Sequence, residues 1–166
     1  EPAIVLNGGI PIYVQLGKKD YKIDWEDFKG KISTKTRMVV INTPHNPSGR
    51  IFSKDDMLQL QEILRPTNIL VVSDEVYEHI VFDHEPHESA SRFEALAERS
   101  FVCASFGKTF HVTGWKMGYC VAPSDLMYEF RKTHQFAVFC VDHPVQRAMA
   151  NYLEDERHYL ELNSFY

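Results

Sequence analysis

The sequence has little of several features that define specialised classes of protein. It holds only three cysteines in 166 residues, and Cys103, Cys120 and Cys140 are too widely spaced to indicate a disulfide framework. We interpret them as buried, reduced thiols. No apolar run approaches the roughly 20 residues that a helix needs to cross a bilayer, and no segment resembles a signal peptide. We therefore expect a cytoplasmic protein without a membrane partner.

Positive charge is also scarce. The 18 lysines and arginines are outnumbered by 23 acidic residues, which gives a formal net charge of −5, and the basic residues form no stripe. A protein that binds nucleic acid usually presents a positive surface to the phosphate backbone, so we expect no nucleic-acid partner. The eight histidines do not suggest a metal site. His84 and His87 have helical spacing, but Pro86 between them would break the helix.

The chain begins at Glu1 without a methionine, and it ends inside a helix-like stretch, 156–162, that carries no stop signal. We expect it to be a segment of a longer protein.

Strand-like and helix-like segments alternate along the chain. Apolar runs predict buried strands at 37–41, 69–72 and 101–104 and a fourth strand at 118–122, and the continuous run at 37–41 is typical of a strand covered on both faces. The segment 10–14 predicts a further strand, at an edge or at its start because of Pro11. Helices are expected from Asp24 to Gly30, after the Ser53 and Asp56 start signal, and over 124–136 and 144–153. This alternation favours an α/β fold with a largely parallel sheet.

Three of the predicted strands run into polar clusters that contain Asn46, Asp74 and the pair Ser105 and Lys108. Sites in parallel α/β sheets gather outside the carboxyl ends of the strands. Each cluster alone is commonplace, since a lysine is usually a surface charge, an aspartate a cap and an asparagine a turn residue. The three together indicate one site.

The segment from Ser105 to Tyr119, SFGKTFHVTGWKMGY, resembles the cofactor-lysine motif of the fold-type I, class I/II aminotransferases, which use pyridoxal phosphate (PLP). Asn46-Pro47-Ser48-Gly49 is similar to the asparagine-proline turn of that family. Asp74-Glu75-Val76-Tyr77 is similar to its aspartate-glutamate-x-tyrosine segment. The three pieces stand in the family's order, and the resemblance covers essentially the whole chain.

The resemblance implies a role for each matching residue. Lys108 would form the aldimine with PLP and then move the proton from the substrate Cα. Asp74 would pair with the pyridinium nitrogen, and Tyr77 and Asn46 would hydrogen-bond the phenolic oxygen of the cofactor. Ser105 and Lys116 would hold the phosphate, one by its hydroxyl and one by its charge.

Lys116 restricts the resemblance to one branch of the family, because many other members have arginine at this position. Together with Gly107 and the stretch 132–136, it is similar to the methionine, kynurenine and glutamine aminotransferase branch. The implied reaction moves an amino group from a methionine-like, aromatic or glutamine-like amino acid to a 2-oxo acid.

The same resemblance implies a three-layer α/β/α large domain over 1–153, here incomplete, and a helix over 154–166 that leads to a missing small domain. It also implies a homodimer. The arginine that binds the substrate carboxylate would lie outside this chain, so the isolated segment is expected to be inactive.

Other interpretations remain open. The chain could be a non-catalytic fragment that only binds PLP or packs against other subunits. Ser105 and Lys108 also fit the serine-x-x-lysine pattern of acyl-enzyme hydrolases, a weaker alternative because the accompanying motifs are absent from the sequence. A phosphate-binding P-loop is rejected, since Val102 stands where that motif needs glycine.

Overall fold

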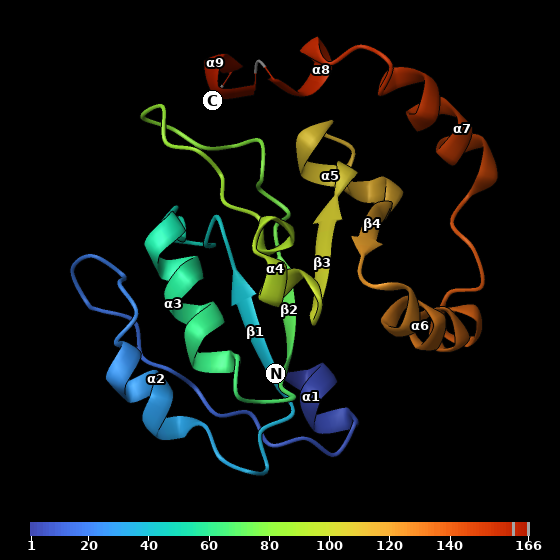
Figure 1. Ribbon diagram of the computed structural model, residues 1–166. Coiled ribbons are helices and arrows are strands. Elements are labelled where there is room, and N and C mark those ends of the chain that lie inside the picture. The colour runs from blue at the N-terminus through green and yellow to red at the C-terminus, as the bar shows by residue number, and fades with distance from the viewer. Residues whose placement is uncertain (161, 166) are drawn as a thin grey trace. The chain divides into compact units, whose positions relative to one another are not determined.

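The computed structural model describes residues 1–160 and 162–165 (Figure 1). The chain divides into two compact units, Glu1–Thr36 and Arg37–Tyr166, and the second unit carries the sheet and every predicted site residue. The predicted domain boundary after residue 153 stays a prediction. Residues 161 and 166 of its second part lie outside the described residues.

The first unit contains α1 (Pro2–Leu6) and α2 (Trp25–Lys31). The predicted helix after Asp24 is confirmed, because the Asp24 carboxylate accepts hydrogen bonds from the backbone N–H groups of Glu26 and Asp27 at 3.0 and 3.1 Å. The predicted strand at 10–14 is wrong. That segment is irregular, and the pairing recorded in this unit is an isolated bridge between Leu16 and Ile23. Pro11 has no N–H to donate to a neighbouring strand.

The second unit is built on a four-stranded sheet in the order β1-β2-β3-β4. Its strands are β1 (Met38–Asn42), β2 (Leu70–Asp74), β3 (Ser100–Ser105) and β4 (Gly118–Val121). β1, β2 and β3 are parallel, and β4 runs antiparallel to β3. The α/β class and the four apolar runs predicted as strands are confirmed.

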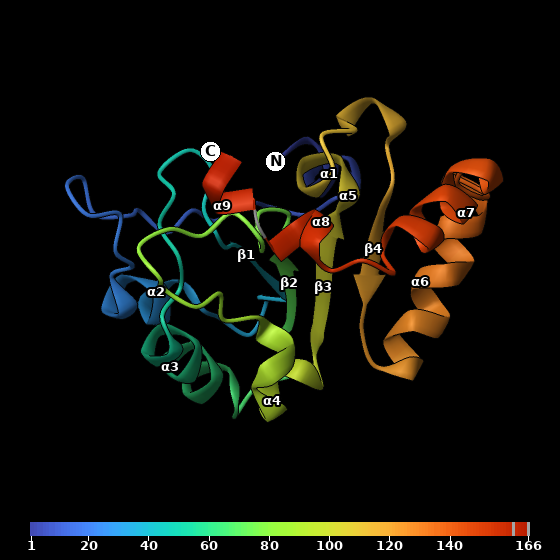
Figure 2. The ribbon, with the colours of Figure 1, turned by 90° about the horizontal axis from the view of Figure 1, so that it is seen from above.

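One face of the sheet forms the core of this unit. Ile41, Val71 and Val102 alternate with more exposed neighbours, as the two-residue period of a strand requires. Figure 2 shows α3 and α4 on the same side of the sheet. The expectation that β1 is covered on both faces is wrong, because Met38 and Val40 are 45% and 58% exposed. On that face of β1, the described residues leave both side chains partly open to solvent.

The predicted helices of this unit are confirmed. α3 (Lys54–Leu64) begins with a capping box in which Ser53 and Asp56 satisfy each other's backbone N–H groups. It buries Met57, Leu60 and Leu64 at helical spacing. α6 (Ser124–Ala137) packs Phe130 near Phe101 of β3, with ring centroids 6.1 Å apart.

α7 (His143–Tyr152) begins at Asp142, which caps it through the Val145 N–H. The remaining elements are short: η1 (Ala90–Arg92), α4 (Glu94–Ala97), α5 (Phe106–Thr109), η2 (Thr113–Trp115), α8 (Arg157–Leu160) and α9 (Leu162–Phe165). The stretch expected as one helix over 156–162 therefore contains α8 and the first residue of α9, with residue 161 not described. Of the described helices, none is long and apolar enough to cross a membrane.

The buried face of α3 yields the first prediction. Leu60→Ala in a full-length protein carrying this segment should lower the free energy of unfolding by about 2–5 kcal/mol, because the leucine is fully buried. Leu58→Ala is the matched control on the same helix, since Leu58 is 38% exposed. Urea unfolding followed by circular dichroism measures both. Equal losses in the two variants would contradict the assignment of the core face.

Candidate functional site

The parallel pairing brings three strand ends to one edge of the sheet. Asn42, the last residue of β1, lies opposite Asp74, the last residue of β2, and Asp74 lies opposite Cys103 of β3. Asn46 follows β1, Ser105 is the last residue of β3, and Lys108 follows it in the same direction. The predicted clusters therefore share one edge, as parallel strands require.

Asn46, Tyr77 and Lys108 are close to one another. The Asn46 Nδ2 donates to the Tyr77 hydroxyl at 3.3 Å, although the two residues are 31 positions apart. The Lys108 Nζ lies 5.8 Å from the centroid of the Tyr77 ring. An amide, a phenol and an amine from three different connections thus converge on one space. The resemblance had assigned all three to the same cofactor.

Asn42 organises this edge, and the sequence reasoning did not assign it a role. Its Nδ2 donates to the Asp74 carbonyl at 3.1 Å, and its Oδ1 accepts from the Asn46 N–H at 2.8 Å. The Asp74 carbonyl also accepts from the Thr43 N–H at 3.0 Å. Asn42 therefore links the turn that carries Asn46 to the strand end that carries Asp74. The sequence signal for this role is an asparagine directly after the predicted strand at 37–41, because its side chain offers both a donor and an acceptor.

Ser105 begins α5, the short helix that presents Lys108. Its Oγ accepts from the Gly107 N–H at 3.1 Å and lies 3.4 Å from the Met117 carbonyl. Gly107 has no room for a side chain, since a Cβ there would lie 2.9 Å from the Thr113 Cα. The turn at Thr113 is consequently held against α5.

Lys116 is exposed and lies in the left-handed region with φ 53°, where an L-residue is strained. The neighbouring Met117 carbonyl accepts from the Phe106 N–H at 3.1 Å, which places the Lys116 backbone next to the start of α5.

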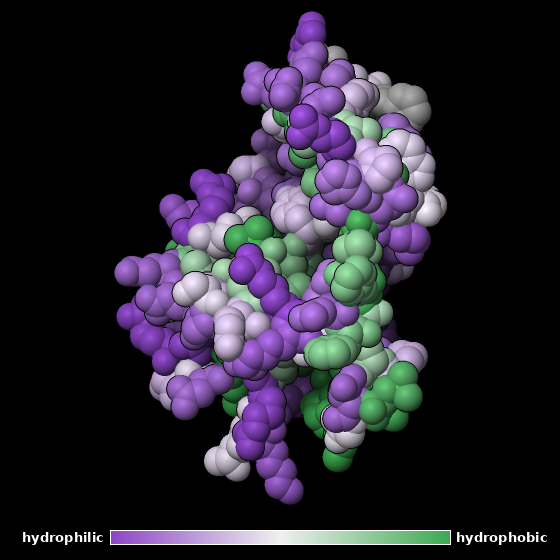
Figure 3. All heavy atoms as spheres, turned by 90° about the vertical axis from the view of Figure 1, so that its right-hand side faces the viewer, coloured by the Kyte–Doolittle hydropathy of each residue, from purple (hydrophilic) through white to green (hydrophobic). Residues whose placement is uncertain are grey.

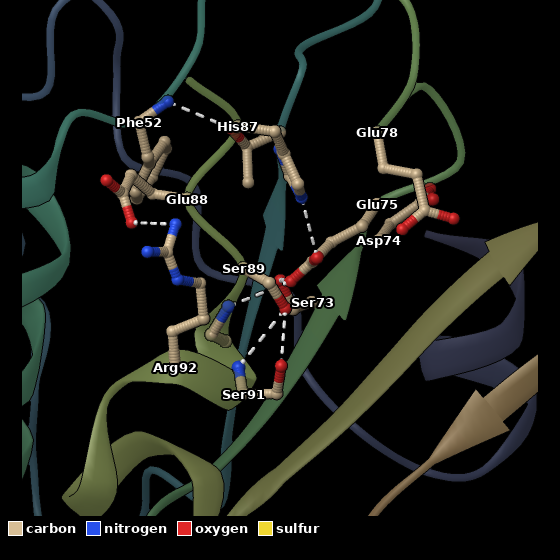
Figure 4. Close-up of polar contacts among 12 residues, drawn as sticks. Phe52, Ser73, Asp74, Glu75, Glu78, His87, Glu88, Ser89, Ser91 and Arg92 are labelled. Carbon is tan, nitrogen blue, oxygen red and sulfur yellow. Dashed lines mark hydrogen bonds and ion pairs between the residues drawn. The ribbon is translucent and has the colours of Figure 1, made fainter. Parts of the chain in front are cut away.

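Behind Asp74, a buried polar network surrounds Glu75, whose side chain is fully buried (Figure 4). Its Oε1 accepts from the Ser73 Oγ at 2.7 Å and from the Ala90 N–H at 3.0 Å. Its Oε2 lies 2.8 Å from the His87 Nε2. Burial alone would raise the pKa of Glu75, but the hydrogen bonds from His87, Ser73 and Ala90 outweigh it, so the pKa lies below its usual value. His87, considered above as a metal ligand, serves this carboxylate instead.

A second carboxylate in the same loop, Glu78, accepts a short hydrogen bond from the Tyr119 hydroxyl of β4. Burial and this hydrogen bond raise the pKa of Tyr119 above its ordinary value. The loop after β2 is thereby attached to β4.

The thiols of Cys103 and Cys120 lie side by side on β3 and β4, with their sulfur atoms 3.8 Å apart. Burial, the neighbouring Cys120 and the carboxylates of Asp74 and Glu75 raise the pKa of Cys103 to about 12. The expectation of buried thiols is wrong for Cys140, which is exposed, while Cys103 and Cys120 are half-buried rather than fully buried.

These residues define the class of site. An amine, a carboxylate, a phenol and an amide at the carboxyl edge of a parallel sheet can hold a ligand that carries a protonated nitrogen, an oxygen substituent and a group that reacts with amines. The hydroxyl of Ser105 and the charge of Lys116 lie along the connection that carries the amine.

Comparison with known proteins identifies the family. The family model "Aminotransferase class I and II" matches residues 1–164, and the chain belongs to that family. A methionine aminotransferase of Escherichia coli is 45% identical over 166 residues. A kynurenine–oxoglutarate transaminase of Dictyostelium discoideum is 35% identical over 168 residues. The resemblance stated from the motifs is therefore confirmed.

Solved structures agree with this membership. The crystal structure of an Escherichia coli protein reported as a methionine aminotransferase superposes with a TM-score of 0.96 at 45% identity and covers 99% of this chain. A PLP-bound putative aminotransferase from Clostridium difficile superposes with a TM-score of 0.76 at 26% identity and covers 84% of this chain.

The chain spans less than half of these proteins. It covers 43% of the Escherichia coli relative and 39% of the Dictyostelium relative, while 99% and 91% of this chain are matched. It likewise covers 44% and 37% of the two solved chains.

The strand thiols yield the second prediction. In native full-length protein at a pH of about 8, Cys103 and Cys120 should react with iodoacetamide much more slowly than in unfolded protein, because only a thiolate attacks and burial disfavours it. Mass spectrometry of the digested protein measures the label at each cysteine. Urea-unfolded protein is the control, in which all three should react alike. Labelling of Cys103 as fast in native as in unfolded protein would refute the assignment.

Proposed function

We propose that the full-length protein carrying this segment is a PLP-dependent transaminase, and that the described strand ends hold most of the cofactor's ligands. The observation that carries the proposal is the convergence of Asn46, Tyr77 and Lys108 beside the end of β2. Family membership supports it. Family membership also favours the transaminase over the serine hydrolase.

The described residues fit PLP in number and in chemistry. Tyr77 and Asn46 are within hydrogen-bonding distance of each other, so both can reach a single phenolic oxygen. When bound, PLP supplies an aldehyde that condenses with amines and a protonated ring that takes up electrons from the substrate.

Lys108 and Asp74 carry the central roles in this proposal. The Lys108 Nζ would be the amine that binds the cofactor aldehyde, and once released it would carry the proton from the substrate Cα to the cofactor. The Asp74 carboxylate accepts the N–H of the ring nitrogen and keeps that nitrogen protonated. Asp74 is held for this task by the bonds from Asn42 and Thr43 to its carbonyl.

The remaining residues orient the cofactor. Tyr77 and Asn46 donate to its phenolic oxygen, and Ser105 donates a hydroxyl to the phosphate. Lys116 adds a positive charge there. As a lysine it acts as a point charge rather than as the two-pronged donor that an arginine offers.

We propose methionine-like, aromatic or glutamine-like amino acids as donors and a 2-oxo acid as acceptor. The named activities of the methionine and kynurenine relatives support this choice. The segment alone is expected to be inactive, in line with its coverage of less than half of these relatives. A cytoplasmic location stays a prediction.

A homodimer is part of the same proposal. The part of the chain around α6 and α7 leaves large apolar side chains exposed: Val121, Tyr128, Phe136, Val138 and Phe139. Figure 3 shows apolar atoms gathered on the face that looks out from this side of the molecule. Exposed apolar patches are typical of surfaces that another part of the protein or a partner covers.

The third prediction concerns the two central residues. In the full-length protein, Lys108→Ala should lower turnover by about 10⁴-fold or more, because the proton-transferring amine is lost. Asp74→Asn should lower it on the order of 10²–10³-fold, because the ring nitrogen loses its anionic partner. The rate of keto-acid formation measures both. Lys29→Ala is the control, since Lys29 is an exposed lysine paired with Glu26. Wild-type turnover in Lys108→Ala would refute the proposed role.

The fourth prediction concerns the donor. In a panel of amino acids at equal concentration with one 2-oxo acid, methionine, aromatic amino acids and glutamine should give the highest kcat/KM. The named activities of the methionine and kynurenine relatives support this order of preference. A preference for aspartate would exclude the proposed substrate class while leaving the transaminase assignment intact.

A further inference from the structure

We propose that Glu75 and His87 form a buried clasp that positions Asp74 and Tyr77 for the cofactor. Glu75 is a positioning residue in this proposal and touches neither cofactor nor substrate. The inference rests on the proposed function, because it assigns a task to residues that stand behind that site.

The clasp acts on Asp74 through both of its sequence neighbours. Successive side chains of a strand point to opposite faces, so Ser73 and Glu75 point to the face opposite Asp74. Both are fully buried, and the Ser73 Oγ donates to the Glu75 Oε1 at 2.7 Å. The Glu75 N–H donates to the Cys103 carbonyl at 2.7 Å and extends the pairing of β2 with β3. These contacts of Ser73 and Glu75 therefore fix the backbone on both sides of Asp74, and with it the direction of the Asp74 carboxylate.

The clasp also closes the loop that carries Tyr77. The Glu75 carboxylate accepts from the Ala90 N–H, 15 residues later, and faces His87, 12 residues later. Figure 4 shows Glu75 between Ser73 and His87, with Asp74 beside it. One side chain thus joins the first residue of the loop to its last residues. Tyr77 stands two residues from the joined point.

His87 contributes one hydrogen bond to this clasp. A carboxylate can only accept, so the His87 Nε2 donates to it. The other ring nitrogen, Nδ1, is buried and has no hydrogen-bond partner among the described residues. A residue that supplies one N–H at the same place should therefore replace His87, whereas an apolar ring should not.

The cofactor affinity of the full-length apoprotein tests the clasp without requiring turnover. PLP is added to the apoprotein, and its dissociation constant is read from the quenching of tryptophan fluorescence. His87→Phe should raise the dissociation constant by about tenfold or more, because a displaced Asp74 and Tyr77 no longer meet the ring. His87→Gln should restore it to within about threefold of wild type. Ser73→Ala should raise it less than His87→Phe does, since it removes one of the hydrogen bonds to the carboxylate.

Two control variants separate positioning from stability. Leu60→Ala loses stability in the core of α3 but should bind PLP as the wild type does, because affinity does not change while the protein stays folded. Glu88→Gln removes a neighbouring carboxylate, one that pairs with Arg92 at 3.1 Å, and should also leave the affinity unchanged.

The outcomes separate the inference from the function beneath it. If the wild-type apoprotein shows no saturable binding of PLP, the proposed function fails. If the wild type binds PLP and His87→Phe binds it equally well, the clasp is wrong and the function stands. Should His87→Phe not fold, Ser73→Ala decides, and wild-type affinity in that variant overturns the clasp.

Discussion

The site depends on the parallel pairing of β1, β2 and β3. Parallel strands end at the same edge, and the register that sets Asn42 opposite Asp74 and Asp74 opposite Cys103 brings three connections together. Hydrogen bonds then refine this coarse alignment, above all those of Asn42, which joins the first two strand ends. A slip of one residue in this pairing would turn Asp74 to the opposite face.

Much of the fold was predictable from local signals. The buried strands were indicated by apolar runs and the start of α3 by its capping box, because both signals act over a few residues. The strand expected at 10–14 was wrong because a strand exists only where a partner pairs with it, and composition does not reveal the partner. The full cover expected over β1 was wrong among the described residues, since an apolar run does not show what lies against each face of a strand.

The candidate site was predictable only through its motifs. Lys108, Asp74, Tyr77, Asn46, Ser105 and Lys116 were found by resemblance, and the structure brings Asn46, Tyr77 and Lys108 together. The network behind them was not predictable. Glu75 stands in the same short motif as Asp74, but its partners lie 12 and 15 residues further along the chain. The alternation of the strand decides that Asp74 faces the site and that Glu75 faces the core.

The loop after β2 has a further consequence. Glu75 joins its two ends, and Glu78 attaches its first half to β4 through Tyr119. Its tip, from Phe82 to Pro86, is exposed, and Asp83 and His84 adopt the left-handed backbone of a reversing turn. The contacts of Glu75 and Glu78 thus lie between the tip and the residues of the candidate site. It is a place where evolution can lengthen or shorten the chain, and where a reporter peptide can be inserted, at little cost to the active edge of the sheet.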